Sequence, residues 1–339
     1  YWQDATMTGA AAFLFAATGN TDYQTHFDTT YQLIEPMQWN YWLPWQSTFQ
    51  DALLYYTDIP GATPAVVNDI EGNAVSSATA NNDNMLPAVL DERDAYRAHM
   101  NSNDYTWGSN RTKCNSALIM YNLLTHDVDA ANHTHYRNAA ADFVHFLHGV
   151  NPLNLTMLTN MYDHGAENTC NEMYDSWFGD GTEFDNALTS LYGPPPGYVT
   201  GGFNPNYQLD PAYFGPPLDP PMNQPVLKSY KDWNTSWPEN SWQITEPAVY
   251  YQAAYVKLLS KFASDDMTTS LPENMPPIMA ANVFPNPAND ELYVSFQNKV
   301  NEAKLTIKLI DVTGQEFQPH FHYSDNTIRM GVSLSLIHI

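Results

Sequence analysis

Positive charge is scarce in this sequence. It has 13 Lys and Arg residues against 37 Asp and Glu, giving a formal net charge of -24 at pH 7. Binding to nucleic acid or to an anionic membrane surface needs clustered basic side chains, so the composition argues against both partners. Apolar runs are also too short to span a membrane. The acidity is compatible with a soluble protein outside the cell.

Cysteine is almost absent, which limits disulfide and metal chemistry. Cys114 and Cys170 could form one disulfide or remain two buried thiols, and neither lies in a CxxC or zinc-type spacing. We favour two structural cysteines. His145 and His148 are three residues apart, but a third ligand is missing from the pattern, so they do not indicate zinc. The sequence therefore predicts no required cofactor.

Aromatic side chains are abundant instead. They make up 14% of the residues, including 9 Trp and 22 Tyr, whereas charged residues make up only 15%. Aromatic faces pack on the apolar faces of sugar rings, and the polar edges of Tyr and Trp donate hydrogen bonds. The composition therefore favours a neutral polar ligand such as a sugar, although an aromatic-rich core would account for most of these residues.

Helical periodicity dominates the first 150 residues and returns near residue 250. A succession of helices without strands predicts an all-α architecture, and bundles, solenoids and toroids all fit it. The sequence begins inside a helical pattern, so we expect its amino-terminal end to be cut. The predicted helices are residues 3–18, 22–35, 46–57, 64–80, 86–100, 114–126, 134–149 and 247–263.

Residues 151–246 form a contrasting region that is rich in proline. Gly193-Pro-Pro-Pro-Gly197 and Pro216-Pro217 exclude regular helix. Loops of this length in a compact domain are usually functional or disordered. The many Trp, Tyr and Phe residues among them favour an ordered, functional loop region.

The pattern changes again after residue 263. Residues 264–282 have the composition of a linker, and residues 283–333 contain strands with a period of two. We expect strands at 292–296, at 305–310 and from Thr327 onward, in a small β-sandwich module. Residues 334–339 break the alternation and resemble the translation of a sequencing adaptor, so we exclude them from the predicted fold.

Glu246 is the most informative single residue. It lies where the proline-rich loops meet the predicted helix 247–263, in the sequence Ser-Trp-Gln-Ile-Thr-Glu-Pro-Ala-Val-Tyr-Tyr. A carboxyl group among aromatic side chains loses hydration, which raises its pKa and suits it to general acid catalysis. A glutamate that only stabilises the helix dipole would occupy the same position.

Five motifs occur in order along residues 1–263, and together they resemble glycoside hydrolase family nine, mostly β-1,4-glucan endohydrolases. The chain is similar to the carboxyl-terminal half of that catalytic domain. Within the family it is most similar to a subgroup with the motifs at 165–172 and 177–181. The five motifs are Trp107-Gly-Ser-Asn110, Phe146-Leu-His-Gly-Val-Asn-Pro-Leu153, Gly193-Pro-Pro-Pro-Gly197 with Gly201-Gly-Phe-Asn-Pro205, Lys228-Ser-Tyr-Lys-Asp-Trp233 and the Glu246 segment.

The resemblance implies part of an (α/α)6 toroid with an open cleft, and an inverting mechanism with two carboxylates. Glu246 matches the position of the acid. The family's base lies in an Asp-Ala-Gly-Asp-Tyr-type motif, which this sequence lacks. Asp91-Glu-Arg-Asp94 has a similar spacing, but we interpret it as a solvated helix start. We therefore expect no hydrolysis by this sequence alone. The alternatives are a non-catalytic glycan-binding surface protein and an exo-acting β-glycosidase of the same family.

Candidates for sugar binding are weaker, because the family's His-His-Arg motif is missing from residues 155–190. Trp177, Trp233, Trp237 and Trp242 could stack on sugars or pack in the core, and we favour Trp242 and Trp177 for the cleft. We expect Trp107 only to anchor a helix start. Gln252 replaces the Asn that follows the family's acid. The polar candidates are His164, Glu172 and Asp232.

Two further expectations follow from the resemblance. Family members often bind structural calcium, and the loop Asp180-Gly-Thr-Glu183 offers oxygen ligands, although acids without metal would look the same. Residues 283–294 (Val-Phe-Pro-Asn-Pro-Ala-Asn-Asp-Glu-Leu-Tyr-Val) and 305–315 resemble the carboxyl-terminal sorting module of type IX secretion substrates, cut at about Ser333. They imply a secreted or cell-surface protein of a Bacteroidota-type bacterium, with the secretion machinery and a β-glucan as partners.

Overall fold

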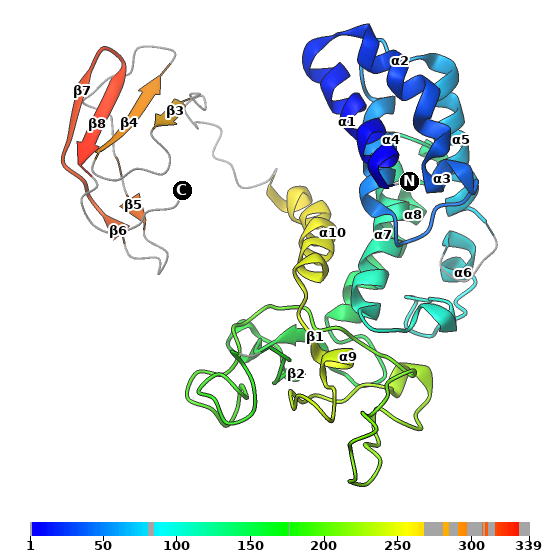
Figure 1. Ribbon diagram of the computed structural model, residues 1–339, viewed down its shortest axis with the longest axis vertical. Helices are drawn as coiled ribbons and strands as arrows, with labels where there is room; N and C mark the ends of the chain where they lie inside the picture. Colours follow the sequence, from blue (N-terminus) through cyan, green and yellow to red (C-terminus); the bar gives the residue numbers. More distant parts are fainter. Residues whose placement is uncertain are drawn as a thin grey trace. The chain divides into compact units, whose positions relative to one another are not determined.

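The computed structural model describes two compact units, Tyr1–Asp265 and Asp266–Ile339 (Figure 1). The predicted tail at 334–339 and most of the predicted linker lie outside the described part of the chain. The residues described are 2–80, 85–175, 177–267, 281–284, 291–296, 307, 309–310 and 316–331.

Helices build most of the first unit, as predicted. They are α1 (Trp2–Thr18), α2 (Thr21–Thr30), α3 (Glu35–Gln38), α4 (Ser47–Thr57), α5 (Pro64–Ala78), α6 (Leu86–Leu90), α7 (Ser109–Thr125), α8 (His133–Leu147), α9 (Trp242–Thr245) and α10 (Val249–Met267), with short 3-10 turns between some of them.

The helix predicted over residues 86–100 is wrong beyond its first turn. Helix α6 ends at Leu90, and Asp91 caps it. Glu92 and Arg97 then adopt positive φ angles of 54° and 60°, which are left-handed conformations that a helix cannot continue through. Residues 22–35 also divide, because α2 ends at Thr30 and a 3-10 turn, Tyr31–Leu33, separates it from α3.

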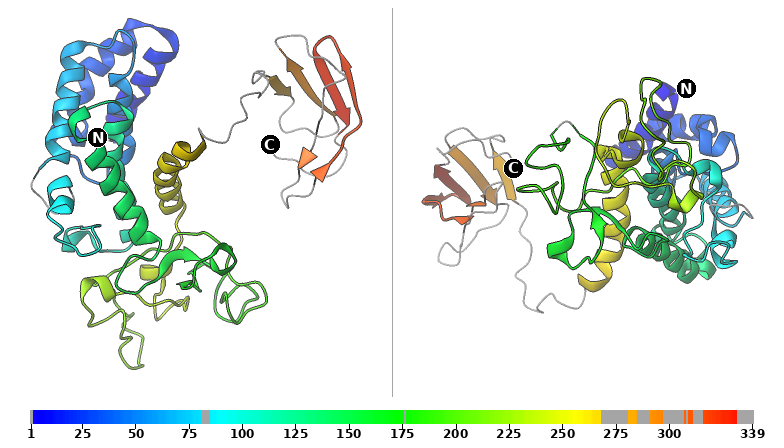
Figure 2. Two further views of the ribbon diagram at one scale, coloured as in Figure 1. Left: turned by 180° about the vertical axis from the view of Figure 1, so that it is seen from behind. Right: turned by 90° about the horizontal axis from the view of Figure 1, so that it is seen from below.

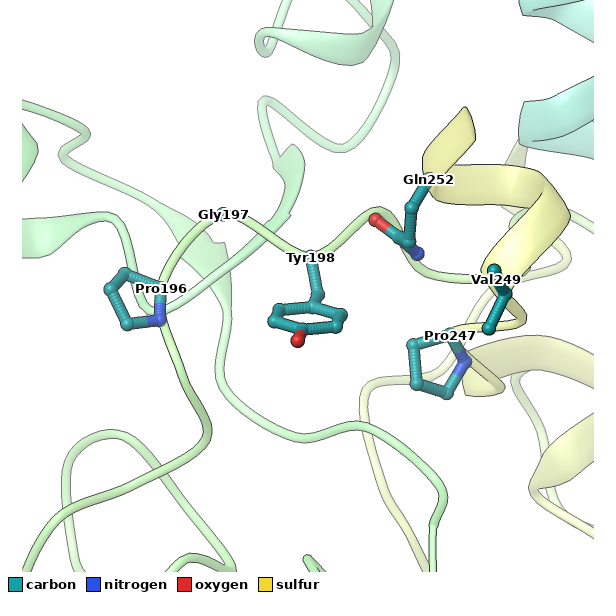
Figure 3. Close-up of a pocket in the computed structure, with 6 residues that line it drawn as sticks. All are labelled: Pro196, Gly197, Tyr198, Pro247, Val249 and Gln252. Atoms are coloured by element: carbon teal, nitrogen blue, oxygen red, sulfur yellow. The ribbon is translucent and has the colours of Figure 1, made fainter. Parts of the chain in front are cut away.

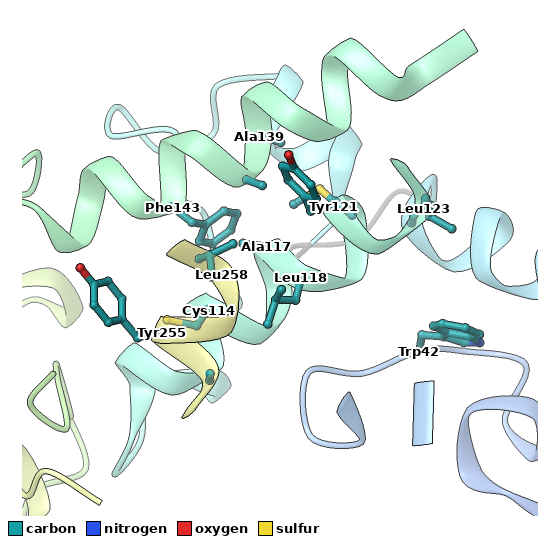
Figure 4. Close-up of a cluster of buried hydrophobic side chains, with 14 of the residues drawn as sticks. Trp42, Cys114, Ala117, Leu118, Tyr121, Leu123, Ala139, Phe143, Tyr255 and Leu258 are labelled. Carbon is teal, nitrogen blue, oxygen red and sulfur yellow. The ribbon is translucent and has the colours of Figure 1, made fainter. Parts of the chain in front are cut away.

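The core lies along α7, whose side chains are buried over most of its length. Figure 4 shows Cys114, Ala117 and Tyr121 of α7 facing Phe143 of α8 and residues of α10. The Tyr121 hydroxyl donates to the Lys261 carbonyl at 2.9 Å, which ties α7 to α10. Burying these apolar surfaces at roughly 25 cal/mol per Å² stabilises the helical packing.

A buried cation, Lys113, sits within this apolar core. Its Nζ donates to the Ala98 carbonyl at 2.6 Å and to the Tyr105 hydroxyl at 3.0 Å. It also lies 3.9 Å from the centre of the Phe146 ring. Burial lowers the pKa of Lys113 to about 7, so these contacts only partly replace the hydration that the ammonium loses.

Loops with little regular structure make up residues 148–246, at one end of α7, α8 and α10 (Figure 1, Figure 2). Two short parallel strands, β1 (Thr156–Thr159) and β2 (Thr169–Cys170), lie among them. Polar side chains fix the backbone. The buried Asn151 amide donates to the Phe146 and Leu155 carbonyls, both at 2.8 Å, and accepts from the Leu153 and Leu155 N–H groups. Such hydrogen bonds, together with buried aromatic side chains such as Phe203 and Tyr230, maintain the order expected from the aromatic content.

The second unit contains antiparallel strands. A four-stranded sheet has the order β3-β4-β8-β7, and β5 pairs with β6. The predicted strands at 292–296 and from Thr327 are confirmed, whereas β7 was not predicted. Leu292, Ile328 and Met330 form the buried core of the second unit. The strands are β3 (Ala281–Phe284), β4 (Glu291–Phe296), β5 (Leu309–Ile310), β6 (Glu316–Phe317), β7 (Phe321–Ser324) and β8 (Thr327–Gly331).

Both cysteines are buried free thiols, so the disulfide alternative is wrong and the preferred interpretation holds. Cys170 lies 3.1 Å from the Tyr230 hydroxyl, whereas Cys114 packs inside α7. In the described residues, none of the helices has both the length and the apolar character needed to cross a membrane.

Candidate active site

Glu246 lies at the junction between α9 and α10. It caps the carboxyl end of α9 with an extended backbone, φ -61° and ψ 130°. Pro247 follows, and a residue before proline is disfavoured in helical conformation. The sequence therefore ends the short helix at Glu246 and leaves its partly buried side chain on a fixed bend between two helices.

Trp107 is the direct partner of this carboxylate. Its indole Nε1 donates to Oε2 of Glu246 at 2.7 Å, across 139 residues of sequence. The Trp107 ring meets Trp242 edge to face, with centroids 5.4 Å apart and planes at 87°. The structure thus brings Trp107 and the predicted Trp242 to Glu246. The sequence interpretation had given Trp107 only a role at the helix start.

Three effects set the pKa of Glu246. Loss of hydration is the largest and raises the pKa, the hydrogen bond from Trp107 lowers it, and the nearby Asp175 charge raises it. The net shift is upward. A larger fraction of Glu246 therefore carries a proton near neutral pH than an exposed glutamate would.

The glycine pair Gly201-Gly202 lets three segments meet beside Glu246. The Gly202 N–H donates to the Ile244 carbonyl at 2.8 Å, and the Asn110 N–H donates to the Gly201 carbonyl at 3.0 Å. A Cβ on Gly201 would lie 2.7 Å from the Ile244 carbonyl oxygen. Gly202 has φ +108°, and its Cβ would lie 2.5 Å from Oγ of Ser109. Only glycine fits this close approach of backbones.

A cavity of about 370 Å³ opens next to the same junction (Figure 3). The Gln252 amide fixes one wall, because it accepts from the Val199 N–H and donates to the Val199 carbonyl, both at 2.8 Å. The Tyr198 ring provides an exposed aromatic face at the rim. The cavity is lined by Pro196, Gly197, Tyr198, Pro247, Val249 and Gln252.

Two of the predicted polar residues, Asp232 and Glu172, form a second cluster. Oδ2 of Asp232 accepts from the Asn171 N–H at 2.7 Å, and Oδ1 accepts from the Glu172 N–H at 3.2 Å. Burial raises the pKa of Asp232 to about 6. Oε1 of Glu172 accepts from the Asn186 amide at 2.6 Å, and burial also raises its pKa. Asp232 therefore fixes the loop backbone at Asn171 and Glu172, whereas Glu172 holds the Asn186 side chain.

Glu172, Asp180 and Asp185 bring carboxylate oxygens within 4.8 Å of one another. Such oxygens are the ligands that calcium prefers. Asp185, however, already accepts from the Gly181 N–H at 2.9 Å and from the Asn234 amide at 2.8 Å. Of the loop predicted to offer ligands, Asp180 belongs to this cluster, and calcium binding stays a prediction.

The other candidates differ in their surroundings. Trp177 is 75% exposed on its loop, and Trp237 is 64% exposed. Trp233 is buried, and its Nε1 donates to Glu239 at 3.1 Å, which favours the core-packing interpretation for that residue. His164 is exposed in the short turn Tyr162–His164. Of the predicted sugar-binding residues, Trp242 is the one that the described contacts connect to Glu246, through Trp107.

Comparison with protein families identifies both units. The family described as glycosyl hydrolase family 9 matches residues 1–259, so the chain belongs to this family. The family described as the secretion system C-terminal sorting domain matches residues 282–334. Both predicted resemblances are confirmed. A search of the curated proteins found no match.

Solved structures of endoglucanases share the fold. A single mutant of a thermostable endoglucanase from Alicyclobacillus acidocaldarius has a TM-score of 0.55 at 19% identity, covering 76% of this chain and 42% of that chain. The family 9 endoglucanase J30 has a TM-score of 0.54 at 21% identity, covering 75% and 41%. The chain thus spans about two fifths of these proteins. The likeness confirms the fold class, part of an (α/α)6 toroid, with a small antiparallel β unit after it.

Proposed function

We propose that this chain carries the proton-donor half of a β-1,4-glucan endohydrolase, with Glu246 as the general acid. One observation carries the proposal: within a family 9 fold, a partly dehydrated carboxyl with a raised pKa lies at a helix junction, and the next residue of that junction, Pro247, lines an open cavity. A protonated carboxyl can transfer its proton to the oxygen of the leaving sugar. The proposed substrate is cellulose or a related β-glucan.

The proposed mechanism inverts the anomeric centre, which requires a second carboxylate far enough away to leave room for water. We propose that this base is an aspartate of an Asp-Ala-Gly-Asp-type motif outside the 339 residues, because the sequence contains no such motif. By this proposal the present 339 residues bind glucan without hydrolysing it. A natural protein that also lacks the motif would instead be a glycan-binding surface protein.

Sugar contacts are proposed for two kinds of side chain. Trp242 lies beside the Trp107–Glu246 pair and Trp177 is highly exposed, so both can offer ring faces to sugars. His164, Glu172 and Asp232 are proposed to hydrogen-bond sugar hydroxyls or to support the loop that does so. Export by type IX secretion, to the medium or the cell surface, is proposed from the sorting-domain match.

The test uses the natural full-length protein and its Glu246→Gln variant. We expect hydrolysis of carboxymethylcellulose to fall at least about 1,000-fold, because Gln cannot donate the proton. Glu167→Gln is the matched control, since Glu167 is an exposed loop glutamate, and it should keep full activity. Near-full activity of Glu246→Gln would refute the assignment. Product analysis on cello-oligosaccharides separates internal cleavage from exo action.

A further inference from the structure

We propose that Trp107 is a positioning residue for Glu246, fixing which carboxyl oxygen carries the transferable proton. This inference rests on the proposed role of Glu246 as the acid. Its geometric basis is the 2.7 Å hydrogen bond from the Trp107 indole Nε1 to Oε2 of Glu246. The sequence resemblance had suggested no such contact.

The direction of this hydrogen bond is fixed by chemistry. An indole N–H can donate but cannot accept, so Oε2 must be an acceptor whether Glu246 is ionised or protonated. The hydroxyl oxygen of a protonated carboxyl is a weaker acceptor than its carbonyl oxygen, so the hydrogen bond from Trp107 to Oε2 favours the proton on Oε1. Oε1 becomes the oxygen that can donate to a leaving group, and Oε2 stays bound to the protein.

One neighbour packs on the indole, and another packs against the backbone next to it. Its ring meets Trp242 edge to face at 5.4 Å, and Trp242 begins the same short helix that Glu246 ends. Trp107 is followed by Gly108, which has φ +84°, and Tyr251 of α10 approaches so closely that a Gly108 Cβ would lie 2.6 Å from its hydroxyl. Donor and acceptor are thus both anchored to the α9–α10 segment.

The hydrogen bond also opposes the effect of burial. It stabilises the ionised carboxylate, whereas dehydration and Asp175 stabilise the protonated form. Without the indole N–H, the Glu246 pKa should rise further and the carboxyl should rotate more freely. A positioning residue therefore affects both the protonation range and the geometry of the acid.

The first experiment observes the pair directly and needs no hydrolysis. The 339-residue chain, labelled with ¹⁵N in its 9 Trp indoles, is titrated between pH 4 and 8 by NMR. The signal missing from Trp107→Phe identifies the Trp107 indole. We expect that signal to shift with a midpoint above the ordinary glutamate value, and the shift to vanish in Glu246→Gln. A Trp107 signal that does not titrate, or that titrates equally in Glu246→Gln, would overturn the proposal.

The second experiment measures pH–rate profiles of the full-length protein. Trp107→Phe keeps an aromatic ring without the N–H, so we expect kcat to fall about 10-fold, KM to change little and the alkaline limb to move to higher pH. Trp39→Phe, at the exposed C-cap of α3, is the control and should leave the alkaline limb in place. A rise in KM with an unchanged profile would mean that Trp107 only binds sugar, which would refute positioning. Loss of hydrolysis in Glu167→Gln, or its persistence in Glu246→Gln, would count against the proposed function instead.

Discussion

The helices of the first unit and the loops at their end are stabilised in different ways. Around α7, apolar side chains pack face to face, and Tyr121 and Phe143 are buried between α7, α8 and α10. In residues 148–246, side-chain amides bind the backbone directly, as Asn151 and Gln252 do. Glu246 lies where the two regions meet. The difference teaches that the site depends on hydrogen bonds and close backbone approaches in addition to apolar packing.

The largest expected effect comes from Gly202→Ala, which tests the close approach in the loops. The new Cβ would lie 2.5 Å from Oγ of Ser109 on a backbone with φ +108°. Strain and overpacking together should lower the free energy of unfolding by about 4 kcal/mol. Urea denaturation of the 339-residue chain measures it. A decrease in the free energy of unfolding below about 1 kcal/mol would mean that the loop backbone relaxes around the new Cβ, and it would contradict the proposed difference between loops and helices.

Asn151→Ala tests whether a side-chain amide that binds the loop backbone stabilises the fold more than a side-chain amide in a helix does. It removes a buried side chain with four hydrogen bonds to backbone groups, which should cost about 3 kcal/mol. Asn122→Ala in α7 is the matched control, because the Asn122 amide donates to Asp51 at 3.1 Å, and we expect about 1 kcal/mol. Equal losses in denaturation would show that the two regions do not differ in this respect.

The pH dependence of stability tests Asp232, a half-buried acid of the loops. The pKa of Asp232 is raised from 3.8 to about 6 in the folded protein, so folding binds its proton more tightly. The stabilisation of the folded protein that comes from this tighter proton binding is fully present below pH 4, and it is lost as the pH rises through about 6. We expect Asp232→Asn to reduce this decline, measured by denaturation at pH 4, 5, 6 and 7. An unchanged slope would contradict the burial of this carboxyl.

The smallest expected effect is a gain, from Gly72→Ala in α5. Gly72 is exposed, and a Cβ there would meet nothing within 4 Å. Alanine should raise the free energy of unfolding by about 0.5–1 kcal/mol, because it reduces the entropy of the unfolded chain. Thermal denaturation of Gly72→Ala and Gly202→Ala should show stability changes of opposite sign for the same glycine-to-alanine substitution. A loss at Gly72 would show that α5 tolerates change no better than the loops.

Local patterns in the sequence predicted most of the helical part. Segments such as 46–57 and 134–149 repeat apolar residues at helical spacing, and that spacing survives in the fold. The prediction failed after Leu90, where Glu92 and Arg97 take left-handed conformations that no periodicity reveals. The two short strands among the loops were also missed, because β1 and β2 are held by pairing rather than by an alternating pattern.

The candidate site was predictable only in part. Glu246 was identified from its position between the loops and a predicted helix, from its aromatic neighbours and from the family resemblance. Its contact with Trp107 spans 139 residues, and a long-range hydrogen bond leaves no local trace in one sequence. The glycine pair Gly201-Gly202 was recognised as a motif, but its cause, the approach of Ile244 and Ser109, required the structure.

The central claim is that Glu246 donates a proton to the leaving group, and substrate reactivity tests it most directly. Dinitrophenolate leaves without protonation, whereas a sugar alkoxide does not. We therefore predict that Glu246→Gln in the full-length protein loses at least about 1,000-fold in kcat/KM on cello-oligosaccharides but less than about 10-fold on 2,4-dinitrophenyl cellobioside. Equal losses on both substrates, or no loss on either, would contradict the account.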